Sequence, residues 1–310
     1  MEDETQTLIS KNRSRFSQYT NFILADHECL VCIQDKWNVM KRARSLGIPI
    51  PETFDASDLE SGMALIDRLP YPVVVKPRVG AGGAGLGYVD GPHELEDALR
   101  KAGSRGEGIL VQERLPRDGR GLGASFLMGG RQKVLASFVH ERLREYPVTG
   151  GPSTLRQSIV HEEVRDCAER LLRSFQFRGV AMVEFKIDSR DGVPKLLEVN
   201  PRFWGSLALA VDSGVNFPYL LTLAALDIPF EPVTRYKVGH RTRWLLPGDL
   251  LHFIQNPDRF RMDPSFFRFN EPNLTYDICD RTDPWPTVGA ILSLWPYFRS
   301  RDFEHVRRRR

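Results

Sequence analysis

The most regular pattern in the chain is an alternation of apolar and polar positions over residues 180–187, which is typical of a half-buried strand. Residues 188–192 are turn formers, and residues 194–200 resume the pattern as a second strand. We therefore predict a β-hairpin that turns about Asp191. Apolar residues on both sides of the turn indicate that both strands are well buried.

This hairpin would place two acids side by side. Glu184 and Glu198 are each seven residues from Asp191, so they are cross-strand neighbours, and Asn200 shares a face with Glu198. In an apolar sheet the two carboxylates repel each other and lose hydration, whereas a hard cation such as Mg²⁺ takes oxygen ligands and removes that cost. The spacing favours a metal site on Glu184, Glu198 and Asn200 over a surface hairpin with solvated acids. Arg202 follows and is suited to hold a phosphate or carboxylate through paired hydrogen bonds.

Other periodic segments predict an alternation of helices and strands. Apolar residues at helical spacing predict helices over residues 35–46, 59–69, 92–101, 162–174 and 207–226. Short apolar runs predict strands over residues 71–77 and 108–115, and a second hairpin that pairs 124–128 with 133–139.

The remaining segments are less regular. Residues 1–20 are polar and either helical or loose, and residues 22–33 form a buried strand or helix. Residues 142–153 read as an irregular loop. Beyond residue 232 the pattern weakens to a short strand and helix over 244–254, followed by an irregular extension that packs onto the core.

A glycine-dense loop follows the strand that carries Lys76 near its end. Residues 78–87 contain five glycines, whose small size lets backbone N–H groups approach phosphate oxygens. The loop matches neither a Walker motif nor a dinucleotide fingerprint, because no Gly-Lys-Ser/Thr ends it and a strand rather than a helix follows. By itself the loop is as typical of a flexible connection as of a phosphate clamp, and the neighbouring lysine favours the clamp.

Composition excludes several classes of protein. The 310 residues carry a net charge of +3, too small to indicate nucleic-acid binding, and the basic run 307–310 is typical of a solvated tail. No signal peptide and no apolar stretch of transmembrane length is present in the sequence. The four cysteines, with Cys29 and Cys32 close together, indicate reduced thiols rather than a zinc knuckle. We expect a cytoplasmic protein.

Taken in order, the motifs resemble the ATP-grasp superfamily of carboxylate–amine and carboxylate–thiol ligases, and its carbamoyl-phosphate-synthetase-like branch most of all. The matching segments are Asp35-Lys36 with the later GIPIPET, then YPVVVKP, the glycine loop, VQERL, VEF, LEVNPR and RFWGSLALAVDSGVNFPYLL. The resemblance implies an α+β fold, the ATP-grasp fold, in which two α+β subdomains clasp ATP. Residues 1–34 would be an N-terminal segment, 35–231 the ATP-grasp domain and 232–310 a C-terminal extension.

The resemblance also implies roles for individual residues. Lys36 and Lys76 would contact the ATP phosphates, and the glycine loop with Gly82, Gly83 and Gly85 would fold over them. The adenine hinge would be Gln112, Glu113, Arg114 and Leu115, acting largely through backbone groups, with Asp118 as the candidate ribose ligand. Glu184, Glu198 and Asn200 would hold Mg²⁺ or Mn²⁺. Arg202 and Lys76 would be the catalytic groups that stabilise the transferred phosphoryl group.

The implied reaction activates a carboxylate as an acylphosphate, which an amine or related nucleophile then attacks. The best candidates for capture of the carboxylate substrate are Arg144, Gly150, Gly151, Ser153 and Arg156. Small-molecule carboxylate and amine substrates are expected as partners, and neither nucleic acid nor a membrane.

Two departures from the family pattern keep alternatives open. Beyond the hinge, where members commonly carry a carboxylate that binds the ribose hydroxyls, the segment is Arg117-Asp118-Gly119-Arg120, so Asp118 is only a candidate for that contact. Members usually have a full α/β domain before the position of Asp35, and 34 residues are too few for one. Either the C-terminal part builds the substrate site, or a partner chain supplies the missing domain, or the sequence is a shortened form of a longer protein. The oligomeric state stays open, with a homodimer as one alternative by analogy with the family. The alternative function is an ATP-binding regulatory or partner subunit without ligase turnover of its own. A weaker alternative is an adaptor for nucleic acid or a membrane surface built on the arginine tail.

Overall fold

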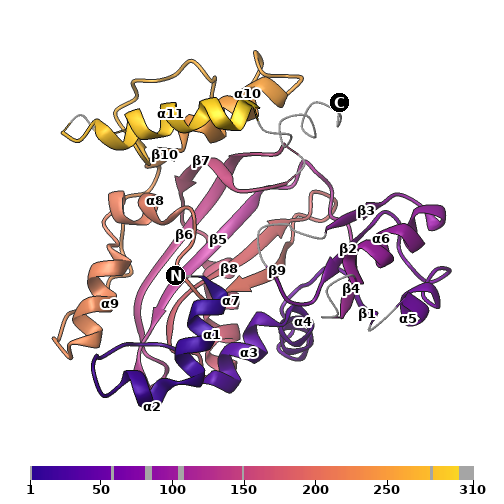
Figure 1. The fold of residues 1–310 in the computed structure, drawn as a ribbon, viewed down its shortest axis with the longest axis horizontal. Helices are drawn as coiled ribbons and strands as arrows, with labels where there is room; N and C mark the ends of the chain where they lie inside the picture. Colours follow the sequence, from indigo (N-terminus) through magenta and orange to yellow (C-terminus); the bar gives the residue numbers. More distant parts are fainter. Residues whose placement is uncertain are drawn as a thin grey trace. The chain divides into compact units, whose positions relative to one another are not determined.

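The computed structural model describes residues 2–56, 59–80, 86–103, 108–148, 150–279 and 282–299 (Figure 1). The chain divides into two compact units. Unit 1 comprises Met1–Glu141 and Ser158–Val238, and unit 2 comprises Arg142–Gln157 and Gly239–Arg310. The α+β class predicted from the sequence is confirmed, because both units combine helices with strands.

A four-stranded antiparallel sheet forms one part of unit 1. Its order is β1 (Thr53–Ala56), β4 (Ile109–Glu113), β2 (Val73–Pro77) and β3 (Gly87–Val89). A 3₁₀ turn (Pro92–Glu94) leads into α6 (Leu95–Gly103), which packs on β2 and β3, and α5 (Leu59–Met63) packs on α6. Buried Val73, Val75, Leu95 and Leu99 form the core between helix and sheet. The strands at 71–77 and 108–115 were predicted, whereas β1 was not.

The larger sheet of unit 1 has the order β6 (Val134–Glu145), β5 (Gly121–Met128), β8 (Gly179–Ile187) and β9 (Pro194–Asn200). Alternate residues of each strand face opposite sides, so the sheet has two cores. One core packs α3 (His27–Gln34), α4 (Lys36–Ser45) and α7 (Glu162–Ser174). The other packs α8 (Leu207–Asp212) and α9 (Phe217–Ala225). Two further helices, α1 (Asp3–Lys11) and α2 (Arg13–Phe16), begin the chain, and α1 packs on α3.

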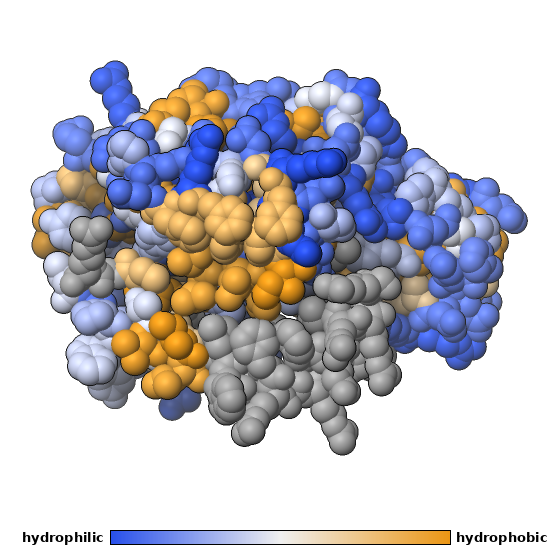
Figure 2. All heavy atoms as spheres, turned by 90° about the horizontal axis from the view of Figure 1, so that it is seen from above, coloured by the Kyte–Doolittle hydropathy of each residue, from blue (hydrophilic) through white to orange (hydrophobic). Residues whose placement is uncertain are grey.

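Unit 2 is built around short strands and two helices. Strand β10 (Arg241–Arg243) pairs antiparallel with β7 (Ser153–Ser158) and parallel with β11 (Leu274–Tyr276). A π turn (Leu245–Asp249) leads into α10 (Leu250–Gln255), and α11 (Trp285–Arg299) ends the described chain. Figure 2 shows a patch of apolar side chains bordered by hydrophilic ones, and unit 2 has exposed phenylalanines at positions 260, 267 and 269.

Two predictions in this region are wrong. The loop predicted over residues 142–153 is irregular only between Glu145 and Ser153, because β6 continues to Glu145 and β7 begins at Ser153. The region after residue 254 is not irregular throughout, since it contains β11 and α11. Among the described residues no helix is both long enough and apolar enough to cross a membrane.

Candidate functional site

The predicted hairpin is present in unit 1 and has the predicted pairing. In its antiparallel ladder Glu184 lies opposite Glu198, and Met182 lies opposite Asn200. The register shifts between Glu184 and Phe185, so the strands are offset by one residue nearer the turn. The hairpin therefore presents both carboxylates and the amide at the same end, as the spacing predicts.

The turn of this hairpin is fixed by a fully enclosed carboxylate, Asp188. Its oxygens accept hydrogen bonds from the backbone and Nε of Arg190, at 3.1 and 2.8 Å, and from Lys195 Nζ at 2.6 Å. The hydrogen bond from the Arg190 side chain is the largest influence that holds the pKa of Asp188 well below its ordinary value. Arg190 also pairs with Glu113 and so ties the turn to β4. The sequence shows the turn residues but gives no sign of this ion-pair network.

The two acids are bridged by the Asn200 side chain. Its Nδ2 donates to Glu184 Oε1 at 2.9 Å and to Glu198 Oε1 at 3.3 Å, while its Oδ1 accepts from Arg202 at 3.2 Å. Here the amide N–H groups hold together two carboxylates that would otherwise repel each other. A cation between the carboxylates would take over this role, and a half-turn of the amide would present its oxygen to the ion.

The donor set of this cluster fits a hard cation. Carboxylate and amide oxygens are the ligands that Mg²⁺ takes, and its remaining positions usually go to water and substrate phosphates. The set contains only two acids, and no cluster of three or more His, Cys, Asp and Glu residues suited to a metal occurs in the described part of the chain. A cation here would therefore depend on ligands from a bound substrate.

Lys76 is a nearly buried cation beside these acids. Its Nζ donates to Gln112 Oε1 at 2.7 Å, and only 8% of the residue is exposed. Burial lowers the pKa of Lys76 to about 8, against the opposing effect of Glu198 and together with that of Lys36. The charges of Glu198 in the hairpin and of Lys36 therefore both act on the pKa of Lys76, in opposite directions. An anion that contacted Lys76 would stabilise its charged form.

Gln112 serves to orient this lysine. Its Nε2 donates to Thr53 Oγ1 at 2.7 Å, which leaves Oε1 directed at Lys76. The sequence predicts Gln112 in the hinge to adenine, whereas its side chain contacts Thr53 and Lys76 and its backbone lies in β4 between β1 and β2. The support that it gives to Lys76 was not predicted.

Lys36, at the start of α4, is joined to the beginning of the glycine loop. Its Nζ donates to the Gly80 carbonyl at 2.6 Å, and its backbone N–H donates to the Arg78 carbonyl at 3.0 Å. Asp35 caps α4 by accepting from Trp37 N at 2.9 Å and also pairs with Arg78. Lys36 thus contacts the first residues of the segment that follows Lys76 in the chain. Gly82, Gly83 and Gly85 fall outside the described residues.

The predicted hinge, residues 112–115, begins within the last two residues of β4. The Glu113 carboxylate accepts from the Glu52 backbone at 3.1 Å and pairs with Arg190, so it is fixed by internal contacts. The next residue, Arg114, pairs with Asp90 at 2.6 Å, and Leu115 is buried. Asp118, the candidate ribose ligand, accepts from Ser189 Oγ at 2.7 Å.

Arg202 has an acidic partner that the sequence did not suggest. Its Nε lies 3.2 Å from an oxygen of Asp3, at the start of α1. The same guanidinium donates to Asn200 and to the Phe203 carbonyl. Because Asp3 and Arg202 are almost two hundred residues apart, no local pattern could have revealed this pair.

The residues predicted to capture substrate lie in unit 2, where the two arginines are engaged in its interior. Arg156 is 1% exposed and donates to Thr242 Oγ1 at 2.8 Å and to the Ser153 carbonyl at 2.9 Å, besides pairing with Asp277. Arg144 lies 2.9 Å from Asp249. These contacts tie the strands of unit 2 together, and a role in substrate binding remains a prediction.

The glycine pair in the same segment has a local explanation. A Cβ on Gly151 would lie 2.3 Å from the carbonyl oxygen of Tyr146, closer than any real contact. Gly150 has a φ of +124°, which side chains disfavour. The tight turn between β6 and β7 therefore requires glycine here whether or not substrate binds.

Comparison with known proteins matches residues 33–206 to a family described as the ATP-grasp domain. Two of the curated relatives are large chains of carbamoyl phosphate synthase. The one from Thermotoga neapolitana is 27% identical over 206 residues, which are 64% of this chain and 18% of that protein. The one from Thermotoga petrophila is 26% identical over 300 residues, 92% of this chain and 24% of that protein. The chain thus spans less than a quarter of the length of these relatives.

Solved structures share the fold at lower identity. The biotin carboxylase domain of Hydrogenobacter thermophilus 2-oxoglutarate carboxylase, in complex with MgADP and bicarbonate, has a TM-score of 0.64 and 14% identity over 75% of this chain and 55% of that one. The N5-carboxyaminoimidazole synthetase of Staphylococcus aureus, complexed with ADP, has a TM-score of 0.58 and 16% identity, covering 70% and 57%. At such identity the likeness speaks for the fold alone.

Proposed function

The chain belongs to the ATP-grasp family, and from this membership we propose that it is an ATP- and Mg²⁺-dependent ligase that activates a carboxylate as an acylphosphate. An amine or a related nucleophile would then displace the phosphate. The observation that carries the proposal is the cross-strand pair Glu184 and Glu198, which the Asn200 amide bridges in unit 1. The charge of Glu198 also acts on Lys76. The relatives with known structures support it, because their complexes contain ADP, in one case with magnesium.

The residues of the site have distinct roles in this proposal. Glu184, Glu198 and Asn200 would hold Mg²⁺, which when bound neutralises charge on the ATP phosphates. Lys36 and Lys76 would bind phosphate oxygens. The pKa of Lys76 of about 8 leaves most of it charged at neutral pH, and contact with phosphate would raise that pKa further.

Arg202 would stabilise charge on the phosphoryl group as it moves from ATP to the substrate carboxylate. A guanidinium suits this task because it donates parallel hydrogen bonds to oxyanions. Activation of this kind is needed because a carboxylate resists nucleophiles, whereas an acylphosphate has a good leaving group. The protein's part is therefore positioning and charge stabilisation, with no nucleophilic side chain required.

A second function is favoured by one contact. Asp3 pairs with Arg202 and so engages the guanidinium that the ligase mechanism needs. A chain in which this pair persisted with ATP bound would bind nucleotide without turnover and act as a regulatory or partner subunit.

The test is ADP release from ATP and Mg²⁺ across pairs of small carboxylates and amines. Wild type is compared with Glu198→Gln, which removes one metal-binding charge, and with Glu96→Gln, an exposed acid on α6 that serves as a matched control. We expect release that one pair stimulates, that Glu96→Gln retains and that Glu198→Gln loses by at least about 100-fold. ATP binding without stimulation by any pair would reject the ligase and favour the second function.

A further inference from the structure

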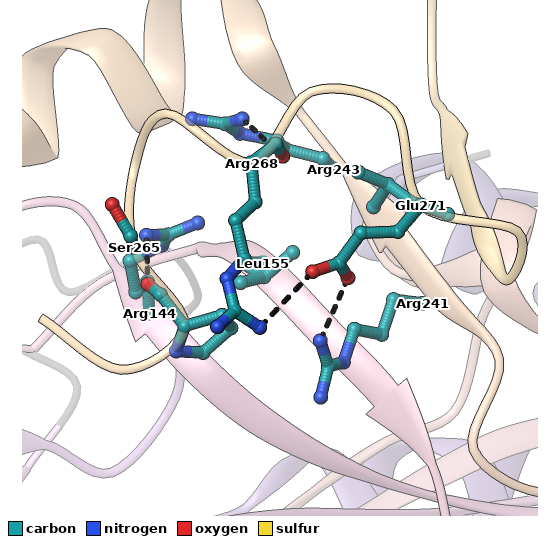
Figure 3. A pocket seen from close by; sticks show the side chains of 9 residues that line it. Arg144, Leu155, Arg241, Arg243, Ser265, Arg268 and Glu271 are labelled. Atoms are coloured by element: carbon teal, nitrogen blue, oxygen red, sulfur yellow. Dashed lines mark hydrogen bonds and ion pairs between the residues drawn. The ribbon is translucent and has the colours of Figure 1, made fainter.

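Unit 2 contains a pocket lined by four arginines (Figure 3). Arg144 enters from β6, Arg241 and Arg243 from β10, and Arg268 from the segment that follows α10. The acid among the lining residues is Glu271, whose carboxylate points between Arg241 and Arg268 in Figure 3. The free space is about 10 Å³, room for one water molecule.

The pocket has more positive than negative charge. Asp249, which is not a lining residue, lies 2.9 Å from Arg144 and 2.6 Å from Arg243, so its one carboxylate pairs with two guanidiniums. The carboxylate of Glu271 likewise pairs with two guanidiniums, at 2.9 Å from Arg241 and 3.3 Å from Arg268. Among the described residues of this cluster, four cations are therefore shared between two acids.

Burial makes this excess costly. Arg243 is 1% exposed and Arg144 is 6% exposed, so water screens neither charge well. Burial lowers the pKa of Arg144 to about 10, and the charges of Arg243 and Arg241 act in the same direction while Asp249 opposes them. A further anion at the pocket would relieve the repulsion between the guanidiniums.

The side chain of Glu271 is placed so that it can move out of the pocket into solvent. It lies in an exposed stretch between Arg268 and β11, and its own side chain is 24% exposed. The side chain of Arg268 is 59% exposed and reaches solvent at the mouth of the pocket. The contacts of Glu271 with two guanidiniums are those that any carboxylate or phosphate group would make.

We propose that this pocket binds a small oxyanion, a carboxylate or phosphate group of a small molecule, and that Glu271 holds its place until the ligand binds. One water molecule's space cannot admit an oxyanion beside Glu271, so binding requires that this side chain move out to solvent. The ligand then pairs with Arg241 and Arg268, with Arg144 behind them. Binding at this pocket does not depend on the proposed ligase function, and it can be measured without nucleotide.

The test is calorimetric titration of the whole chain with inorganic phosphate and, separately, with succinate, at constant ionic strength and without ATP or Mg²⁺. Glu271→Gln keeps the side chain's shape and removes the competing charge, so it should tighten binding by about 10-fold or more. Arg268→Gln removes an exposed partner of the anion and should weaken binding by a similar factor. Arg261→Gln, an exposed arginine of the same segment outside the pocket lining, should leave it unchanged.

Phosphate could also bind the proposed nucleotide site, so each titration is repeated in a Lys76→Met background. Binding that persists there and responds to Glu271→Gln and Arg268→Gln belongs to the pocket. Loss of all binding with Lys76→Met would overturn the proposal, as would no binding to folded Glu271→Gln. If Glu271→Gln does not fold, an unchanged affinity in Arg268→Gln overturns it equally.

Discussion

Replacing Lys76 with methionine should stabilise the fold while it abolishes nucleotide binding. Methionine keeps the length of the side chain and removes a charge that is buried at a cost. The pKa of Lys76 falls from 10.5 to about 8 in the folded chain, which corresponds to about 3 kcal/mol of destabilisation of the charged form. Methionine cannot donate to Gln112, and an unsatisfied acceptor costs about 1 kcal/mol or more. We therefore expect a net gain of about 1–2 kcal/mol at pH 7.

The sign of the pH dependence follows from the lowered pKa. Between the folded value of about 8 and the ordinary value of 10.5, the unfolded chain binds more protons than the folded chain. The free energy of unfolding of the wild type should therefore rise with pH across this window, relative to the variant. Below about pH 8 the cost of the charge is fully present, so the advantage of Lys76→Met is largest there and shrinks towards pH 10.

Urea denaturation at pH 7 and pH 9.5 measures both effects, with Lys133→Met, an exposed lysine, as the matched control. The control should change the free energy of unfolding by less than about 0.5 kcal/mol at either pH. ATP binding by the same variants completes the assay, because Lys76→Met should lose it and Lys133→Met should not. A Lys76→Met chain that is less stable than wild type at pH 7, or whose advantage does not depend on pH, would refute the reasoning.

Three further predictions concern other contacts. Asp188→Asn should lower the free energy of unfolding by about 2–3 kcal/mol in urea at pH 7, because two cations lose their shared acid. The pKa of Asp188 is held below its ordinary value of 3.8, so the difference should be constant above that value, shrink below it, and disappear only as the pH falls through the lower pKa of the folded chain. Asp3→Asn removes the charge that pairs with Arg202 and should raise the kcat of ADP release several-fold with little change in stability; an unchanged kcat would count against that contact's importance. Gly151→Ala should lower the free energy of unfolding by about 1–3 kcal/mol, and with it the thermal midpoint, because the added Cβ clashes with the backbone. Gly130→Ala, where a Cβ meets open space, should leave both unchanged.

The sequence predicted correctly those elements whose residues repeat at a short, regular spacing. The hairpin with Glu184 and Glu198 was predicted because strand alternation and a compact turn fix which residues face each other. Helix α7 was predicted over its whole length because its apolar face repeats at helical spacing. By contrast, strands β10 and β11 have three residues each, too few for any period to be recognised.

The partners of charged residues were beyond the reach of sequence reasoning. Arg156 was predicted to meet a substrate, yet its carboxylate partner, Asp277, lies 121 residues further along the chain. Arg202 meets Asp3 over a still longer separation. Spacing tells which face of an element a charge occupies, but the tertiary fold decides which opposite charge reaches it. Predicted roles for lone arginines are therefore less secure than those for residues on one hairpin.

The cationic groups of both units share one feature, which is that each pairs with a carboxylate of the chain itself. Asp3 pairs with Arg202, and Glu271 pairs with Arg241 and Arg268, so internal carboxylates stand where anionic ligands would bind. Each internal contact must be broken before a ligand gains its own contacts with the same guanidinium. The affinity of either site should thus be lower than its contacts suggest, by the free energy of the displaced pair. Neutralising the internal acid should recover that difference, whereas neutralising an arginine should not.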